Sequence, residues 1–303
     1  MPPARLYGAA GLYRRDIGGI DTTMGNIGVI SIDLTERQFD TISSLVHELC
    51  GINLHVGKKE LVKARLTKRL RELEMENFAS YIDLISSDAG QAEILTMLDA
   101  LSTNLTFFFR EHAHFDLLRQ KVVPEMMLRH AQDRQMRVWS AGCSTGEEAY
   151  SIAIALNEVI ADPAGWDVRI LATDLSTRAL EAARKGVYSR ERLRDTPAGT
   201  IAKYFTWSRS GDAKLYMVNE SLRKMVAFAR LNLIEPWPMR GPFDAIFCRN
   251  VMIYFDKPTQ TRLAERFWEM LCPGGIMFIG HSESFTGVQH RFKYVEPTVY
   301  RRR

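Results

Sequence analysis

The sequence predicts an α/β fold built on a parallel sheet and preceded by an all-helical module. From Arg137 onward, short apolar runs alternate with amphipathic helical segments, which is the pattern of βαβ units. The first apolar run, MRVWSA, leads into a glycine-containing loop and a helix, as in folds that bind nucleotides beyond the first strand. Residues 31–100 show helical periodicity and no evident strand, which predicts the separate helical module.

The composition is that of an ordinary globular protein. Of 303 residues, 46% are apolar and 25% are charged, and a formal charge of +4 neither requires nor excludes nucleic acid as a partner. No stretch approaches the roughly 20 apolar residues of a membrane span, and no secretory signal is evident, so we expect a cytoplasmic protein without membrane insertion. The cysteines lie far apart without metal-ligand spacing, so no metal is expected: Cys50, Cys143, Cys248 and Cys272.

The N-terminal third divides into a tail and the helical module. Residues 1–30 lack sustained periodicity and are expected to be a disordered tail, with translation from Met24 as an alternative start. The module, residues 31–100, opens with a helix that Thr35 is expected to cap and Gly51 to end. A second helix carries a basic run over residues 58–71, a pattern that is most often a solvated helix face.

The remaining residues, 101–303, are expected to form one α/β domain. Its strands are predicted in MRVWSA, DVRILATD, FDAIFC, GIMFIG and the C-terminal FKYVEPTVYR. The strand and helix rhythm breaks over about 187–231, where β-branched and aromatic residues flank a turn at Ser210-Gly211-Asp212. We interpret this stretch as a small antiparallel β insertion.

The loop after the first strand, Gly142-Cys143-Ser144-Thr145-Gly146, fits the G-x-S-x-G pattern of a hydrolase nucleophile. Asp244 and His281 follow in the order that a Ser-Asp-His triad would need. Against this hypothesis, the loop follows the first convincing strand, and no glycine-rich oxyanion segment precedes it. A nucleophilic Ser144 is therefore the disfavoured interpretation.

A loop built for close approach of a ligand explains the same residues better. Its glycines let the backbone come near the ligand, and the free N–H groups of the following helix favour a negatively charged group. Asp174 ends the second strand, where it can bind ribose hydroxyls, and Glu147 in the first helical turn could face an ammonium group. Because the full G-x-G-x-x-G pattern is missing, the sequence favours S-adenosylmethionine (SAM) over NAD.

With these residues placed, the sequence resembles the CheR family, SAM-dependent methyltransferases that esterify glutamate side chains of bacterial chemoreceptors. The likeness runs from about Leu34 to Tyr300 and is carried by STNLTFFFRE, WSAGCSTGEEAYSIA, ILATDLS, Asn232-Leu233, FDAIFCRNVMIYFD and GHSES. It implies a Rossmann-like SAM-dependent methyltransferase domain with a small antiparallel β insertion, preceded by an all-helical N-terminal domain. The implied activity is protein-glutamate O-methylation in chemotaxis-type adaptation, with S-adenosylhomocysteine as the second product and no metal.

The resemblance also assigns site residues. Arg110 and Tyr254 are expected to flank the transferred methyl group, and Arg110 also belongs to the cofactor site. The other implied cofactor residues are Asn104, Thr106, Ala141, Gly142, Glu147, Asp174, Asn232, Leu233, Arg249 and Asn250. His112 and His114 are interpreted as surface or helix-start histidines rather than metal ligands, and His281 as a structural residue or, as an alternative, a catalytic one.

The implied partners are chemoreceptors. In the family a basic helix faces the cytoplasmic helices of the receptor, and the β insertion can dock a receptor C-terminal peptide, so recruitment to membrane receptor arrays is expected. The rival hypothesis is a nucleic-acid methyltransferase that uses the basic helix 58–71 as its grip. Against it, RNVMIY lacks the Asn-Pro-Pro-aromatic pattern of base-methylating enzymes, and no aromatic stacking platform interleaves with the basic residues. A cofactor-binding regulator without catalysis is a third hypothesis.

Overall fold

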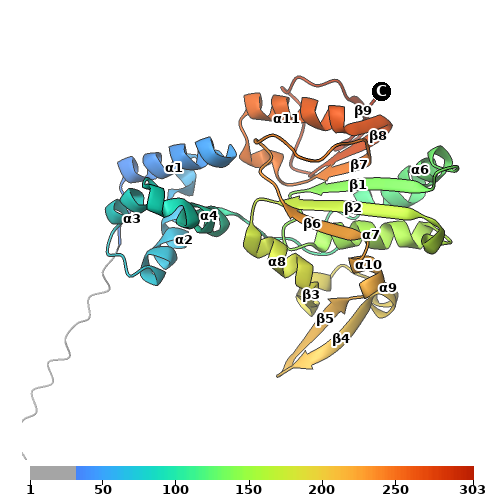
Figure 1. The fold of residues 1–303 in the computed structure, drawn as a ribbon, viewed down its shortest axis with the longest axis horizontal. Helices are drawn as coiled ribbons and strands as arrows, with labels where there is room; N and C mark the ends of the chain where they lie inside the picture. Colours follow the sequence, from blue (N-terminus) through green and yellow to red (C-terminus); the bar gives the residue numbers. More distant parts are fainter. Residues whose placement is uncertain (1–31) are drawn as a thin grey trace, which may run out of the picture. The chain divides into compact units, whose positions relative to one another are not determined.

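The computed structural model describes residues 32–303, and the expected tail and the alternative start at Met24 lie outside this range. The helical module consists of four helices, α1 Glu36–Cys50, α2 Lys59–Glu72, α3 Phe78–Ile85 and α4 Gln91–Leu101 (Figure 1). The predicted cap is present at α1, where the Thr35 hydroxyl accepts a hydrogen bond from the Gln38 N–H and the Gln38 side chain accepts one from the Thr35 N–H. Gly51 ends α1 in the left-handed conformation with φ of 73°.

The main sheet has seven strands in the order β6-β2-β1-β7-β8-β10-β9. The first five strands in this order are parallel, and β10 pairs antiparallel with both β8 and β9. The strands are β1 Gln135–Ala141, β2 Asp167–Asp174, β6 Val226–Arg230, β7 Phe243–Cys248, β8 Leu271–Ile279, β9 Lys293–Glu296 and β10 Val299–Arg301. The prediction of an α/β fold on a largely parallel sheet is confirmed.

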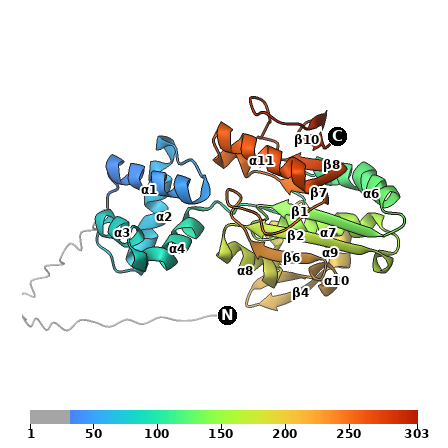
Figure 2. The same ribbon diagram turned by 45° about the horizontal axis from the view of Figure 1, so that its top comes forward.

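Helices cover both faces of this sheet. Along β1, Val138 packs into the core on one face and Trp139 into the core on the other, and Phe247 and Ile246 of β7 alternate in the same way. Figure 2 shows α11 on one face and α7 on the opposite one. The helices of this domain are α5 Ala113–Leu117, α6 Val123–Arg129, α7 Glu147–Val159, α8 Thr177–Lys185, α9 Ala198–Tyr204, α10 Glu220–Arg223 and α11 Lys257–Met270.

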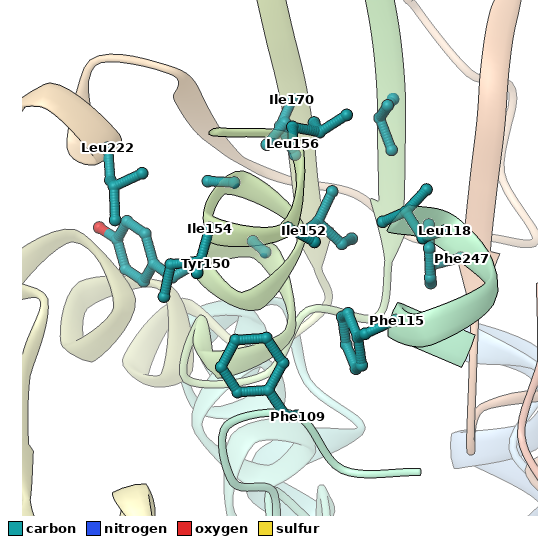
Figure 3. Close-up of a cluster of buried hydrophobic side chains, with 14 of the residues drawn as sticks. Phe109, Phe115, Leu118, Tyr150, Ile152, Ile154, Leu156, Ile170, Leu222 and Phe247 are labelled. Carbon is teal, nitrogen blue, oxygen red and sulfur yellow. The ribbon is translucent and has the colours of Figure 1, made fainter. Parts of the chain in front are cut away.

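An apolar core packs α7 against the sheet. Ile152 and Leu156 of α7 pack with Phe115, Phe247 and Ile170 in one continuous apolar cluster (Figure 3). Burying such side chains stabilises the fold by roughly 1.5–3 kcal/mol each. The loop between β1 and α7 is therefore held at both ends by buried elements.

The β insertion is smaller than the sequence predicts. It is a three-stranded antiparallel sheet in the order β3-β5-β4, formed by β3 Val187–Ser189, β4 Phe205–Ser210 and β5 Ala213–Val218. The expected boundary at about residue 231 was too late, because Val226–Arg230 is β6, which pairs in parallel with β2 in the main sheet. The sequence of β6 resembles that of the insertion strands, and only its pairing with β2 distinguishes it.

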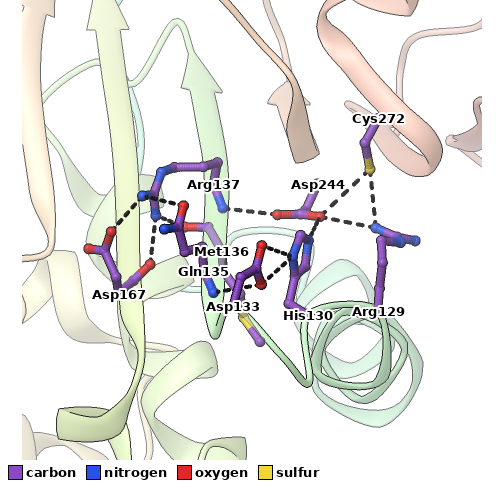
Figure 4. Close-up of polar contacts among 9 residues, drawn as sticks. All are labelled: Arg129, His130, Asp133, Gln135, Met136, Arg137, Asp167, Asp244 and Cys272. Carbon is purple, nitrogen blue, oxygen red and sulfur yellow. Dashed lines mark hydrogen bonds and ion pairs between the residues drawn. The ribbon is translucent and has the colours of Figure 1, made fainter.

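A polar network lies at the amino-terminal ends of β1 and β7 (Figure 4). The Asp244 carboxylate, at the start of β7, is 4% exposed and accepts hydrogen bonds from Arg129, His130 and the backbone N–H of Arg137. Several donors thus satisfy this buried carboxylate.

Among the described helices, none combines the length and apolar character needed to span a bilayer.

Candidate functional site

A cavity of about 400 Å³ lies at the carboxyl ends of the parallel strands and is also lined by the helical module. This volume falls within the usual range of small-molecule sites. Ten of the twelve predicted site residues line it: Asn104, Thr106, Arg110, Gly142, Asp174, Asn232, Leu233, Arg249, Asn250 and Tyr254. Ala141 and Glu147 are the two that the structure places elsewhere.

The glycine loop approaches the cavity through its backbone. Gly142 has a φ of 85°, and a Cβ atom there would lie 2.3 Å from Val251 Cγ2, so only glycine fits. The N–H groups of Gly142 and Cys143 donate to the Thr173 carbonyl at 2.7 and 2.9 Å. The loop is thereby tied to the end of the neighbouring strand β2.

Asp174 links this loop to the end of β2. Its carboxylate accepts hydrogen bonds from the N–H groups of Ser144 at 2.7 Å and Ser176 at 2.9 Å. Burial raises the pKa of Asp174, and these N–H groups oppose that change. Two ordered donors and a place in the cavity lining suit a carboxylate that receives ligand hydroxyls.

The glutamate that faces the cavity is Glu148, one position beyond the predicted Glu147. Glu147 is fully buried, accepts a hydrogen bond from the Thr145 hydroxyl at 2.6 Å and lies 3.4 Å from Arg192. Glu148 lines the cavity and accepts hydrogen bonds from the Ser140 hydroxyl at 2.7 Å and Arg249 at 3.0 Å. Successive helical residues differ by about 100° in direction, so these adjacent acids face different surroundings, and a role of Glu147 in cofactor binding stays a prediction.

Ala141 belongs to the core rather than to the cavity. It is 0% exposed and belongs to the same buried apolar cluster as Trp139 and Ile246. It ends β1, so it supports the glycine loop from behind.

Three arginine side chains hold the segment that joins the helical module to the α/β domain, residues 101–107. Arg65 of α2 donates to the carbonyls of Leu101 and Ser102 and to the Thr103 hydroxyl. Arg110 donates to the Leu105 carbonyl at 3.1 Å, and Arg192 donates to that of Thr106. Asn104 and Thr106 therefore reach the cavity on a backbone that charged donors fix at several points.

Two hydrogen bonds tie the end of α1 and the loop after it to the far wall of the cavity. The Asn232 side-chain amide donates to the Leu49 carbonyl at 2.7 Å, and the Asn53 N–H donates to the Tyr254 carbonyl at 2.8 Å. The Asn232 side chain thus joins the two modules. Leu233 beside it contributes apolar lining.

Arg249 is occupied by two acidic side chains. It is 5% exposed and forms ion pairs with Glu111 at 2.9 Å and Glu148 at 3.0 Å. Burial raises the pKa of Glu148, and Arg249 opposes that change; at Glu111 the pairing outweighs burial, and its pKa is lowered. The Arg249 guanidinium therefore neutralises the charges of Glu111 and Glu148 beside the cavity.

Besides the ion-paired Arg249, three cationic side chains line the cavity: Lys58, Arg65 and Arg110. The Lys58 ammonium lies 5.1 Å from the centre of the Tyr254 ring, and burial together with Arg65 lowers the pKa of Lys58. Lys58, Arg65 and Glu148 are the charged lining residues that the sequence did not assign to the cofactor site. The basic run on α2 signalled the first two, but it was interpreted as an outward face.

His114 corrects the expectation of a surface histidine. It starts α5 as expected, but it is only 2% exposed, and its Nε2 lies 2.7 Å from the Thr298 hydroxyl. Glu111, His114 and His281 bring potential ligand atoms within 4.8 Å of one another. Glu111 is already paired with the Arg249 guanidinium, a cation that competes with a metal ion for this cluster.

The geometry argues against the hydrolase hypothesis. The Asp244 carboxylate accepts a hydrogen bond from the N–H of Arg137 near the start of β1, whereas Ser144 follows the end of that strand, so the two residues lie at opposite ends of the parallel strands. Within residues 32–303, the cavity lining includes no histidine. The Ser144 N–H donates to Asp174, and its hydroxyl lies 3.3 Å from the Asn104 carbonyl. These contacts are those of a loop residue that supports the cavity.

Comparisons with known proteins identify both modules. Residues 104–301 match the CheR methyltransferase SAM-binding domain, and residues 37–102 match the CheR methyltransferase all-alpha domain. A relative from Pseudomonas aeruginosa, "Chemotaxis protein methyltransferase 2", is 44% identical and aligns with 88% of this chain and 93% of its own. "Chemotaxis protein methyltransferase" from Klebsiella aerogenes is 42% identical over 89% of this chain and 90% of its own, and that from Escherichia coli is 41% identical over 88% and 91%.

The cavity fits the cofactor of that SAM-binding domain. It has a position that only glycine can occupy, Gly142, and the carboxylate of Asp174 at the end of β2. Its volume suits a nucleoside-sized ligand. The matches cover most of the chain and agree with the order of modules in the structure. This chain belongs to the CheR methyltransferase family.

Proposed function

We propose that this protein transfers a methyl group from SAM to glutamate side-chain carboxylates of chemoreceptors, giving glutamate methyl esters and S-adenosylhomocysteine. One observation carries the proposal: the cavity that suits SAM also contains Lys58, Arg65 and Arg110, while its lining within residues 32–303 offers no histidine base. Cationic side chains suit an anionic acceptor. An acceptor that is already ionised needs no base.

The chemistry of a carboxylate acceptor matches this set of residues. A glutamate side chain has an ordinary pKa of about 4.3, so at neutral pH it is an anion ready to attack. SAM, when bound, supplies an electrophilic methyl group on a sulfonium. Since opposite charges are neutralised as the reaction proceeds, water would stabilise the separated ions more than the transition state. The protein's task is to bind, orient and exclude water.

We assign the roles as follows. The backbone of the glycine loop and Asp174 hold the cofactor, with Asn104, Thr106, Asn232 and Leu233 around it. Arg110 and Lys58 orient the incoming carboxylate, and Tyr254 hydrogen-bonds beside the transferred methyl group. Weak guidance serves better than a firm grip, because tight binding of the ground-state carboxylate would slow transfer.

The receptor is expected to reach this cavity past the helical module. Lys68 of α2 has an exposed side chain, which suits contact with acidic receptor helices. The hairpin of β4 and β5 exposes Trp207 and Met217, a surface that suits a receptor C-terminal peptide. Binding at either place would recruit the protein to membrane receptor arrays.

The basic helix is a weak candidate for a nucleic-acid grip. Lys59 pairs with Glu36, Lys63 with Asp33, and Arg69 with Glu93, each within 2.7 Å. Cations already engaged inside the molecule contribute less to phosphate binding. The alternative of a nucleic-acid methyltransferase is therefore not favoured.

The test uses the full chain, radiolabelled SAM and a panel of acceptors that includes chemoreceptor cytoplasmic domains, DNA and RNA. Label on the receptor that mild alkali releases as methanol is expected, since carboxyl methyl esters hydrolyse and N-methylated bases do not. A receptor with its methylated glutamates changed to alanine is the matched acceptor control. Alkali-stable label, or label on nucleic acid alone, would refute the proposal.

Arg110→Ala tests the assigned role within the same assay. The turnover number should fall about tenfold or more, as expected when an interaction of roughly 1.4 kcal/mol in the transition state is lost. Affinity for S-adenosylhomocysteine, measured by calorimetry, separates this effect from weaker cofactor binding. A normal turnover number would remove Arg110 from the reacting arrangement.

A further inference from the structure

One buried carboxylate, that of Glu283, holds the loop that carries Asn250 and Tyr254. Glu283 lies in the GHSES turn after β8 and is 7% exposed. Its Oε2 accepts hydrogen bonds from the N–H groups of Gly280 and of Asn250, the latter at 2.8 Å, and its Oε1 accepts one from Ile253 at 3.2 Å. Backbone donors from two separate segments thus meet on a single side chain.

This contact holds an uncommon backbone conformation. Asn250 has a φ of 59°, in the left-handed region, which few residues other than glycine adopt but which asparagine tolerates. The bond from its N–H to Glu283 fixes that conformation from within the fold. On the same side, a Cβ atom at Gly280 would lie 2.4 Å from the Asn250 side-chain nitrogen, so only glycine allows this approach.

The Glu283 carboxylate is suited to holding backbone N–H groups, and it is not placed to contact a ligand directly. Each of its partners is an N–H donor, and an ionised carboxylate only accepts. Within residues 32–303 it forms no ion pair, and it does not line the cavity. Burial raises the pKa of Glu283, and the backbone N–H groups oppose that change.

The held loop reaches the site at its other end. Arg249, Asn250, Val251, Ile253 and Tyr254 all line the cavity, and the Tyr254 N–H donates to the Val251 carbonyl. Glu283 binds the N–H groups immediately before and after Val251 and Met252. A shift at these two points would move the Tyr254 side chain relative to the cofactor.

We propose that Glu283 is a positioning residue for methyl transfer, which fixes the backbone of residues 249–254 so that Asn250 and Tyr254 face the cavity in the reacting arrangement. The identity of the acceptor rests on the proposed function, whereas the effect on the loop does not. The GHSES segment thereby gains a role in addition to closing the turn after β8.

The test compares Glu283→Gln with Asp244→Asn in the full chain. Both substitutions alter a buried carboxylate that accepts a backbone N–H, but Asp244 lies at the amino-terminal ends of the strands, away from the cavity. The measurements are kcat and KM for receptor methylation, affinity for S-adenosylhomocysteine by calorimetry, thermal unfolding, and amide hydrogen exchange of the 249–254 peptide by mass spectrometry.

For Glu283→Gln we expect kcat to fall about tenfold, the effect of losing roughly one hydrogen bond's worth of positioning in the transition state. KM for the receptor should stay within about twofold, and exchange in residues 249–254 should accelerate. Asp244→Asn should lower the unfolding temperature while leaving kcat and exchange in that peptide unchanged. Glu283→Asp, which keeps the charge on a shorter side chain, should also lower kcat.

Normal kcat or normal exchange in Glu283→Gln would overturn the proposal, as would an equal loss of kcat in Asp244→Asn. If Glu283→Gln fails to fold, Glu283→Asp decides through the same measurements. Failure of both to fold, with Asp244→Asn folded, would assign Glu283 to folding alone and also overturn it. A wild-type protein that methylates no receptor would refute the proposed function, while hydrogen exchange would still test the positioning role.

Discussion

Arg65 and Lys68 are near neighbours on α2, yet the structure predicts different outcomes for their substitution. Arg65 donates to the Leu101 and Ser102 carbonyls and to the Thr103 hydroxyl, so it fixes the segment that leads to Asn104 and Thr106. The Lys68 side chain is 75% exposed, and its ammonium lies 3.9 Å from Glu72. The first therefore supports the cofactor cavity, whereas the second is exposed, and we expect it to contact a receptor.

The expected magnitude follows from the bonds that Arg65 loses. Hydrogen bonds to charged groups contribute about 1.5–3 kcal/mol each, and partial exposure and retained contacts reduce the net loss in Arg65→Lys to about 1–2 kcal/mol. That corresponds to roughly 5- to 30-fold weaker binding of S-adenosylhomocysteine if ordering of residues 101–106 is coupled to binding. Lys68→Glu should leave this affinity within about twofold while lowering receptor methylation.

Calorimetry with S-adenosylhomocysteine and receptor methylation kinetics separate the two roles. Arg65→Lys keeps the positive charge, so a residue that acted only by attracting acidic receptor helices would tolerate it in both assays. Unchanged cofactor affinity in Arg65→Lys would refute the reasoning from the linker contacts. Unchanged methylation kinetics in Lys68→Glu would remove the exposed face of α2 from receptor docking.

Three further predictions address the glycine loop and the buried histidine. Ser144→Ala should keep most methyl transfer, since its backbone N–H still reaches Asp174, whereas a hydrolase would lose activity in an ester-hydrolysis assay. Gly142→Ala should abolish detectable S-adenosylhomocysteine binding in calorimetry, because its Cβ would lie 2.3 Å from Val251 Cγ2; normal affinity would contradict the close packing. Burial and Arg249 lower the pKa of His114 to about 3, so its neutral form contributes stability that is complete above about pH 6.5 and is lost as the pH falls towards 3. His114→Gln should reduce the slope of unfolding free energy in this window by up to about 1.4 kcal/mol per pH unit, measured by urea unfolding, and an unchanged slope would contradict it.

Local patterns sufficed for the elements whose partners lie near them in the chain. The Thr35 cap, the glycine loop and Asp174 each follow from a few neighbouring residues and the ends of one strand. The motif does not say which of the adjacent acids Glu147 and Glu148 reaches the cavity, because that depends on how α7 packs against the sheet. A one-residue difference is beyond what the motif specifies.

Long-range contacts account for the other differences. Arg65 binds carbonyls 36 and 37 residues later in the chain, and no periodicity on α2 distinguishes this inward arginine from its outward neighbours. Likewise β6 is a short, half-exposed strand that becomes part of the main sheet only through its pairing with β2. The burial of His114 depends on Thr298, at the opposite end of the domain sequence.

The hydrogen bonds from Asn232 to Leu49 and from Asn53 to Tyr254 make the helical module part of the cavity wall rather than an independent binding domain. If a partner that binds the outer side of the module shifts these two contacts, it changes the affinity of the cavity for its ligand, and by linkage the ligand changes the affinity for the partner by the same factor. The helical module or the α/β domain expressed alone would lack this shared wall, so its binding of ligand or partner would not represent that of the full chain.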